Sequence, residues 1–260
     1  MVVAVTGGTG TLGTSVAREL VGRGHEVRQL SRGRSPEVAG AVHHPIDLTT
    51  GAGLERALNG VEVVIDAANS LRRARQVLVE GTRRLAETAQ AAGVRHHLLC
   101  SIVGIEHVPA AYYRVKIDQE AVVTGGQIPW SIVRATQFHA LLDAIFTLTA
   151  RAGVLPRPSF RLQPIDVDTV AQILADTAEA TPSSRRTEIA GPQVLPVGEL
   201  ARSWRRWTGK RAVLVPVPLF GAPARGLRDG ALTAPAAASD SPTFERWLRA
   251  TKPQSRGGSG

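Results

Sequence analysis

The sequence predicts an α/β fold built on a doubly wound parallel sheet, and three observations lead to it. The apolar run at residues 2–5 is typical of a buried strand and ends in a glycine-rich turn. The turn leads into a segment in which Leu12, Val16 and Leu20 fall on one helical face. Strand-like and helix-like segments then alternate as far as Arg134, as they do where helices connect parallel strands.

The glycine-rich turn spans Thr6–Gly13, with glycines spaced three residues apart. A helix that starts after such a turn offers unpaired backbone N–H groups and a partial positive charge to a phosphate. We expect Gly7 to allow the tight turn, Gly10 to allow the approach of a pyrophosphate, and Gly13 to allow the helix to pack on the strand. The alternative is a glycine-rich turn without a ligand. The expected cofactor-binding residues here are Gly7, Thr9, Gly10, Thr11, Leu12 and Gly13.

A second strand is expected at 26–31, after Gly22 and Gly24 close the first helix. Its end is where the adenosine ribose of a dinucleotide should lie. An NAD-binding chain commonly has an acidic residue there, whereas this chain has Ser31 and Arg32, with Arg34 nearby. Arginine matches a 2′-phosphate, so the sequence favours NADPH/NADP+ over NADH. The alternative for Arg32 is a surface arginine in a polar loop.

Two further strands are expected at 42–46 and 61–66. The first ends in Asp47 and Leu48, where a carboxylate could meet the adenine amino group or cap the next turn. The second is followed by small and polar residues that would let a cofactor lie against the backbone. These are Ala67, Ala68 and Asn69.

A long helix is expected over 78–92, where Gly93 ends it. The remaining elements of the sheet region are a strand at 96–101, a helix at about 113–124 and a strand at 130–134. Ligands of such a sheet bind beyond the carboxyl ends of the strands.

Three residues with chemistry follow the carboxyl end of the fifth strand: Ser101, Tyr112 and Lys116. Tyr112 and Lys116 are four residues apart, so they share one face of a helix. A phenol, whose ordinary pKa is about 10, transfers protons poorly at neutral pH unless a nearby ammonium stabilises the phenolate. The pattern therefore predicts Tyr112 as the acid-base group, Lys116 as its electrostatic partner and ribose anchor, and Ser101 as the donor that orients the substrate oxygen.

The chain resembles the short-chain dehydrogenase/reductase superfamily, and within it the atypical NmrA-like branch of NAD(P)H-binding proteins. The residues that carry the resemblance lie at 6–13, 31–32, 100–104, 112–116, 120, 134–138 and 163–167. The resemblance runs from Met1 to about Leu248. It implies a Rossmann-type sheet that binds NADP(H), and a substrate cleft formed by the C-terminal part. It also implies that Thr136 lies at the cofactor. Some NmrA-like members lack the tyrosine and regulate without turnover. This chain keeps both Tyr112 and Lys116.

The C-terminal part is expected to form a small lobe that covers the substrate. We predict a Rossmann core at 1–155, the lobe at 156–250 and a flexible tail at 251–260. Gln137, Phe138 and His139 leave the sixth strand on the ligand side, so they are expected substrate residues. A core aromatic and a surface imidazole are the alternatives for the last two. Helices are expected at 140–148, 166–179, 195–208 and 243–250, a strand at 211–217 and an irregular stretch at 221–240.

Composition narrows the class of protein. The 260 residues suit one large domain or a core with a small lobe, and the single cysteine, Cys100, fits a reducing compartment. No apolar run approaches the roughly 18 residues that span a bilayer, and no cleavable leader precedes the first strand. We therefore expect a cytoplasmic protein with no membrane partner. Its oligomeric state is not indicated.

The net charge of +9 comes from 31 basic and 22 acidic residues and favours acidic ligands. The arginines are scattered and no aromatic stacking motif accompanies them, so no nucleic-acid partner is expected. No metal is expected either, because the pairs His43–His44 and His96–His97 lie on strands, where neighbours point to opposite faces.

The sequence thus predicts an NADPH-dependent oxidoreductase that transfers hydride to or from a small organic carbonyl or alcohol. Two alternatives share these residues: an NADP(H)-binding regulatory or redox-sensing protein without turnover, and an isomerase or dehydratase of the same fold. Near the expected cleft, Arg72, Arg73 and Arg75 could hold an acidic substrate or form a solvated start of a helix.

Overall fold

The computed structural model describes residues 1–33 and 38–252, in which contacts divide the chain into two compact units. The first unit comprises Met1–Ser101, Ala110–Arg134 and Val167–Thr187, and the second comprises the segments between and after them. The units therefore interleave along the chain, whereas we expected one division after residue 155. Arg34 and most of the expected tail lie outside the described residues. Each unit is described by itself below.

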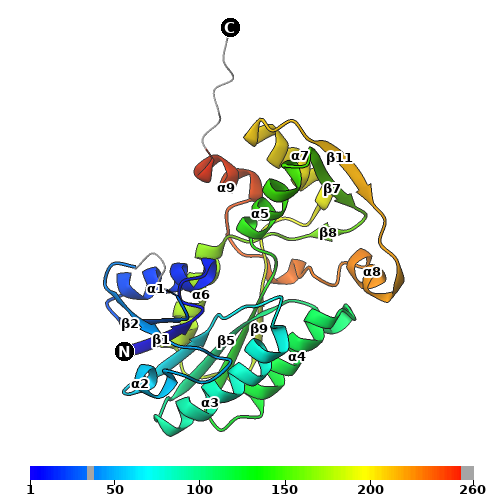
Figure 1. The fold of residues 1–260 in the computed structure, drawn as a ribbon. Helices are drawn as coiled ribbons and strands as arrows, with labels where there is room; N and C mark the ends of the chain where they lie inside the picture. The colour runs from blue at the N-terminus through cyan, green and yellow to red at the C-terminus, as the bar shows by residue number, and fades with distance from the viewer. Residues whose placement is uncertain (34–37, 253–260) are drawn as a thin grey trace. The chain divides into compact units, whose positions relative to one another are not determined.

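A seven-stranded sheet forms the centre of the first unit (Figure 1), in the order β3-β2-β1-β4-β5-β6-β9. The pairings from β3 across to β5 are all parallel. This confirms the doubly wound Rossmann-type sheet, since the order reverses direction between β1 and β4. The strands are β1 (Val2–Thr6), β2 (Glu26–Ser31), β3 (Ala41–Pro45), β4 (Val63–Asp66), β5 (His96–Ile102), β6 (Trp130–Ala135) and β9 (Arg186–Ile189).

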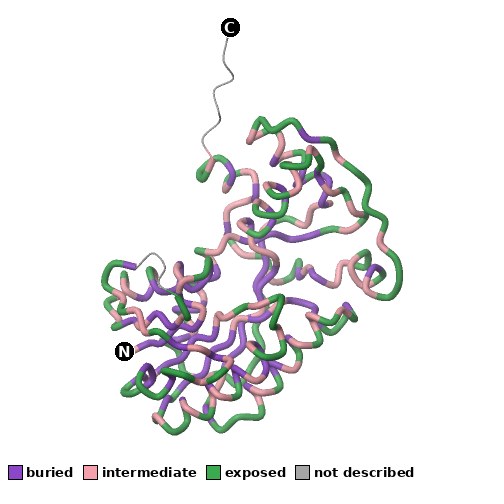
Figure 2. Tube along the Cα trace, viewed as in Figure 1, coloured by how far each residue is buried: buried purple, intermediate pink, exposed green. Residues whose placement is uncertain are grey.

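Helices cover both faces of this sheet (Figure 1). On one face α1 (Thr11–Gly22) packs against α6 (Val167–Glu179). On the other face lie α2 (Leu54–Leu58), α3 (Gly81–Ala91) and α4 (Ala111–Thr124). Figure 2 shows the strands mostly buried between these layers.

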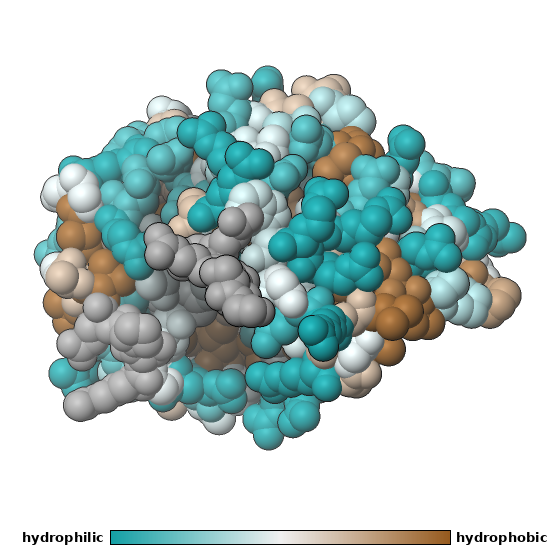
Figure 3. All heavy atoms as spheres, turned by 90° about the horizontal axis from the view of Figure 1, so that it is seen from above, coloured by the Kyte–Doolittle hydropathy of each residue, from teal (hydrophilic) through white to brown (hydrophobic). Residues whose placement is uncertain are grey.

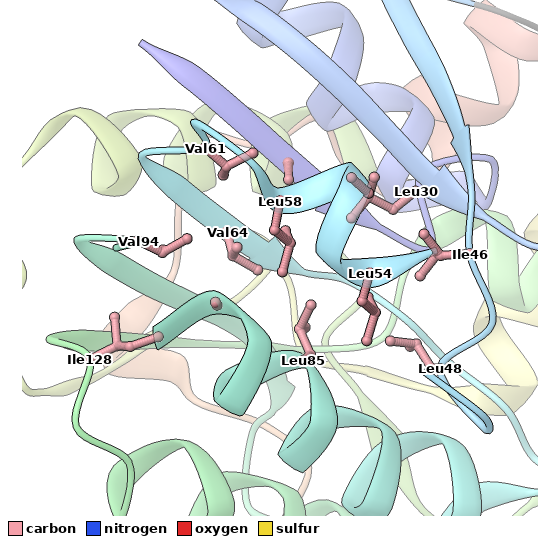
Figure 4. Packing of buried hydrophobic residues seen from close by; sticks show 13 residues of the cluster. Leu30, Ile46, Leu48, Leu54, Leu58, Val61, Val64, Leu85, Val94 and Ile128 are labelled. Atoms are coloured by element: carbon pink, nitrogen blue, oxygen red, sulfur yellow. The ribbon is translucent and has the colours of Figure 1, made fainter. Parts of the chain in front are cut away.

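The core under α2 and α3 is aliphatic (Figure 4). Leu30 and Val64 from the sheet meet Leu54 and Leu58 of α2 and Leu85 of α3, all with at most 1% of their surface exposed. Burying each such side chain contributes about 1.5–3 kcal/mol. This packing fixes the helices against the sheet and so fixes the loops at its carboxyl edge.

Several elements differ from the sequence expectation. The helix expected from residue 78 begins at Arg75 as a π-helical segment, η1 (Arg75–Glu80), before α3. The short helix α2 was not expected. Strand β9 was not expected either, because its first three residues are exposed and only Ile189 is buried.

The second unit has its own apolar core. There α5 (His139–Ala150), α7 (Val197–Thr208) and α9 (Phe244–Thr251) pack with two small sheets. The sheets pair β7 (Val154–Pro158) with β11 (Val213–Val217) in parallel, and β8 (Arg161–Leu162) with β10 (Leu195–Pro196) in antiparallel fashion. Buried Phe146 and Trp204 lie 6.0 Å apart between ring centroids at its centre.

Two expectations in this unit were wrong. Leu195 and Pro196, expected in a helix, form β10 by pairing with β8, and the helix α7 begins at Val197. The stretch expected to be irregular contains α8 (Gly221–Arg228) and the 3-10 helix η3 (Pro235–Ala237). Its glycine at 226 allows close packing, since a Cβ there would overlap the carbonyl oxygen of His107.

Among the described helices, none is both long and apolar enough to cross a bilayer. Figure 3 shows hydrophilic residues over much of the face it presents, with hydrophobic groups between them. Exposed large apolar side chains include Leu148, Val213 and Phe220 of the second unit.

Candidate cofactor and proton-transfer site

The glycine turn is built so that backbone approaches backbone. Gly7 has φ +60°, in the left-handed region, and a Cβ there would lie 2.8 Å from the carbonyl oxygen of Ala67. Gly10 precedes α1 and its N–H donates to Gly7 O at 2.8 Å. A Cβ on Gly13 would overlap that same oxygen. The tight turn therefore requires glycine at Gly7, and the close packing of α1 requires it at Gly13.

The beginning of α1 fits a phosphate. No side chain caps this end of the helix, and its first turn, which includes Thr11 and Leu12, contains no acidic residue. Its backbone N–H groups and dipole are thus available to an anion. Thr9 lies in the turn itself, half-buried. The cradle that a Cβ would fill and the uncapped helix together suit the pyrophosphate of a dinucleotide.

The ends of β2 and β3 carry the residues expected at the adenosine. Ser31 Oγ donates to Gly33 O at 2.7 Å and lies 2.9 Å from His43 Nε2. Arg32 is exposed. Asp47 Oδ1 accepts hydrogen bonds from the N–H and hydroxyl of Thr49, at 2.8 and 2.7 Å. In this structure the carboxylate therefore caps the following turn, one of the two roles that the sequence left open.

Charges near Asp47 form a cationic neighbourhood. Its pKa is lowered, first by the hydrogen bonds from Thr49 and further by the positive charges of Arg32 and Arg73. Leu48 is buried next to Gly81, where a Cβ would lie 2.9 Å from the Cβ of Leu48. Of the expected arginine cluster, Arg75 forms an exposed ion pair of 2.9 Å with Asp118, while Arg72 and Arg73 are exposed.

The loop after β4 connects the glycine turn to the expected acid-base residues. Ala67 and Ala68 lie against Gly7, and Asn69 Oδ1 accepts a hydrogen bond from Tyr112 Oη at 2.8 Å. Burial raises the pKa of Tyr112, and the hydrogen bond to Asn69 opposes that rise. The structure thus places Tyr112 beside the carboxyl end of β4.

Lys116 is buried on the same helix as Tyr112, but its ammonium contacts other groups. Nζ donates to Gln119 Oε1 at 2.6 Å and to Cys100 O at 3.1 Å. Burial lowers the pKa of Lys116, and nearby Asp66 and Glu120 act in the opposite direction. The shared helical face is as expected, whereas the ammonium is hydrogen-bonded to neighbours other than the phenol in this structure.

Ser101 is also buried, and its hydroxyl faces Glu120. It contributes to the low pKa of that carboxylate, although it makes no hydrogen bond of ordinary geometry with the described residues. Glu120 itself is held by Arg134 Nη2 and Arg186 Nε, each at 2.8 Å. Ser101 therefore lies on the side of α4 that is anchored to β6 and β9.

Sequence reasoning missed a buried polar network around Asp66, which has no exposed surface. Its carboxylate accepts from Thr6 Oγ1 at 2.6 Å, Thr82 Oγ1 at 2.8 Å and Gln119 Nε2 at 3.2 Å. Two signals could have found it: an acidic residue closing an apolar strand, and a glutamine three residues after Lys116 on the same helical face.

The remaining expected site residues belong to the second unit and are held by partners within it. Thr136 Oγ1 donates to Gln163 O at 2.6 Å, and Gln137 Nε2 donates to Leu232 O at 3.0 Å. Phe138 is half-buried and precedes α5. For this part of the site, the structure shows side chains engaged in the packing of their own unit.

His139 is fully buried, which differs from the substrate-pocket role that we expected. Its Nε2 lies 2.9 Å from Pro242 O, and its ring packs against Phe244 and Trp247. Burial lowers the pKa of His139 to about 4, so the imidazole is neutral near pH 7. The sequence could not reveal this because the partners come from the far C-terminal helix.

The fold and the glycine turn define a dinucleotide-binding protein of the doubly wound α/β class. The chain belongs to the NAD(P)H-binding family, whose sequence pattern matches residues 7–181. This confirms the family resemblance drawn from the sequence and gives the chain a reductase-like, NAD(P)H-binding fold.

Individual relatives span both enzymes and assembly factors. The chain is 31% identical to the ceramide reductase of Caulobacter vibrioides over 228 residues, covering 80% of this chain and 67% of that one. It is 27% identical over 233 residues to the photosystem II assembly factor Ycf39 of Trieres chinensis, covering 85% and 73%. The structure of the NADPH-dependent quinone oxidoreductase QOR2 of Escherichia coli, complexed with NADPH, matches with a TM-score of 0.77 at 18% identity, covering 95% and 99%.

Proposed function

We propose that this protein is an NADPH-dependent oxidoreductase that transfers hydride to or from a small organic carbonyl or alcohol. The observation that carries the proposal is the position of Tyr112, which is hydrogen-bonded to Asn69 in the loop that also contacts the glycine turn. A proton donor is thereby held next to a cradle suited to a dinucleotide. The reductase among the relatives supports the same class of reaction.

In the proposed reaction, separate residues bind the cofactor, transfer the proton and orient the substrate. The N–H groups at the start of α1 bind the pyrophosphate, and Ala67 and Ala68 leave room for the cofactor along the backbone. When bound, NADPH supplies the hydride and NADP+ accepts it. Tyr112 Oη gives its proton to the carbonyl oxygen in reduction and takes it back in oxidation. The Lys116 ammonium stabilises the phenolate, and Ser101 orients the substrate oxygen.

An NADP(H)-binding protein without turnover is the second candidate. It is favoured by the contacts of Lys116, whose ammonium donates to Gln119 and Cys100, and by the raised pKa of Tyr112. The similarity to a photosystem II assembly factor points the same way. Under this reading the protein would bind a small molecule or a partner protein without transferring hydride.

An ultraviolet titration of tyrosinate with NADP+ bound distinguishes the two. The chain has only two tyrosines, so subtracting the spectrum of Tyr112→Phe isolates Tyr112. For the enzyme we expect Tyr112 to ionise well below the ordinary pKa of about 10, because the Lys116 ammonium must stabilise the phenolate. Ionisation at or above that value would favour the protein without turnover.

Cofactor preference supplies a further prediction. Arg32→Ala should weaken NADPH binding by about tenfold or more and leave NADH binding nearly unchanged, because only NADPH has a 2′-phosphate for the guanidinium. Equilibrium titration of cofactor fluorescence measures both affinities, and Arg18→Ala on α1 is the matched control. An unchanged ratio of the two affinities would remove Arg32 from the cofactor site.

A further inference from the structure

A continuous line of buried hydrogen bonds runs from the glycine turn to Lys116. Thr6, the last residue of β1, donates to Asp66 Oδ1 at 2.6 Å. Asp66 Oδ2 accepts from Gln119 Nε2 at 3.2 Å, and Gln119 Oε1 accepts from Lys116 Nζ at 2.6 Å. Thr82 joins the line by donating to Asp66 at 2.8 Å and accepting from Gln119 at 3.0 Å.

The donors along this line suit an ionised Asp66. Gln119 presents N–H groups to Asp66, and the backbone N–H of Ala68 also donates to it, at 3.3 Å. These groups can only donate, as can the Lys116 ammonium at the other end of the amide. The arrangement therefore matches an ionised carboxylate at one end, an ammonium at the other, and a side-chain amide whose dipole is aligned between them.

We propose that Asp66 and Gln119 are positioning residues for Lys116: the buried carboxylate orients the amide, and the amide oxygen holds the ammonium in place on α4 and stabilises its charge. Lys116 needs this support because a buried ammonium without an opposite charge loses its proton readily. A charged Lys116 is what the phenolate of Tyr112 requires, and in this respect the role of Asp66 and Gln119 rests on the proposed function.

The same carboxylate joins Lys116 to the cofactor cradle. Thr6 is followed directly by Gly7, and Ala68 contacts Gly7 as well as donating to Asp66. Asp66 thus receives hydrogen bonds from two of the segments that shape the pyrophosphate turn. Of the other titratable groups near Lys116, the Glu120 carboxylate favours the ammonium, whereas burial raises the pKa of the Cys100 thiol to about 11, so it carries no charge near pH 7.

The charge of Lys116 can be measured without substrate or cofactor. The chain has only three lysines, Lys116, Lys210 and Lys252, so NMR of protein labelled with ¹³C at lysine Cε gives three signals to titrate. In Asp66→Asn and in Gln119→Met, we expect the titration midpoint of Lys116 to fall by at least about one pH unit. The titration midpoints of Lys210 and Lys252 should not change.

Gln119→Met keeps the length of the side chain and its helical propensity. It therefore tests whether the amide stabilises the Lys116 ammonium even if Asp66→Asn does not fold. Gln76→Met, on the exposed side of η1, is the matched control and should leave all three midpoints unchanged. A Lys116 midpoint equal to that of wild type in folded Gln119→Met would overturn the proposal. Loss of the reductase assignment would leave this readout intact, because it does not require turnover.

Discussion

Tyr112→Phe is expected to lower turnover by about 10²–10⁴-fold, the range that a positioned acid-base group contributes. The substitution removes only the hydroxyl that donates to Asn69 at 2.8 Å, while the ring remains to pack against Tyr113. NADPH binding should be retained because the glycine turn is untouched. Steady-state assays with a panel of small carbonyl compounds measure kcat/KM, and cofactor fluorescence measures binding.

Tyr113→Phe is the matched control, since the two rings lie 5.8 Å apart on the same helix. Burial raises the pKa of Tyr113 too, but no neighbouring charge or hydrogen-bond partner contributes to its shift. Turnover within about twofold of wild type is expected for this variant. If Tyr112→Phe retained full activity, the proton donor would have to be a different group.

Glu120→Gln is expected to lower the free energy of unfolding by about 3–5 kcal/mol, as breaking a buried ion pair does. The Glu120 carboxylate is 3% exposed and accepts from Arg134 Nε at 2.9 Å and from Arg186 Nε at 2.8 Å. A neutral amide would leave Arg134, itself 11% exposed, without its opposite charge. Urea unfolding followed by circular dichroism at pH 7 measures the difference.

This stabilisation should depend on pH in one direction. Arg134, Ser101 and Arg186 lower the pKa of Glu120 against the effect of burial. A carboxyl group whose folded pKa lies below its unfolded value of about 4.3 stabilises the fold above that value, and the contribution is lost as pH falls through the folded pKa. The stability gap between wild type and Glu120→Gln should therefore narrow below about pH 4.

Glu245→Gln provides the comparison at the surface. Its ion-pair partner is Arg249, one helical turn away at 3.4 Å, and both side chains are largely exposed. Trp207 Nε1 also donates to this carboxylate, at 3.4 Å. Such ion pairs contribute about 0.3–0.5 kcal/mol. A similarly small effect at Glu120 would mean that water compensates Arg134 in the variant.

The sequence was enough to predict the fold where several local patterns occur together. The turn after β1 combines an apolar run, spaced glycines and an amphipathic helix, so its fold could be predicted almost to the residue. Tyr112 and Lys116 were predictable for the same reason, because helical spacing alone puts them on one face. The contacts of the Lys116 ammonium were not, since they depend on which strands and helices come together.

The elements that were missed depend on distant partners. The exposed residues of β9 do not show a pattern typical of a strand, and β9 is recognised from backbone hydrogen bonds such as Thr136 N to Ile189 O, at 3.1 Å. Asp66 looks like an ordinary end of a strand until Thr82 and Gln119 are brought to it. His139 resembles a pocket residue until α9 packs over its ring.

The interleaving of the two units has a consequence for any attempt to divide the protein. The chain passes from one unit to the other after Ser101, Pro109, Arg134, Asp166 and Thr187. A fragment that stops near residue 155 would lack α6, the helix that packs against α1. Neither unit can therefore be inherited, exchanged or expressed as one uninterrupted stretch, so recombination must keep nearly the whole chain together.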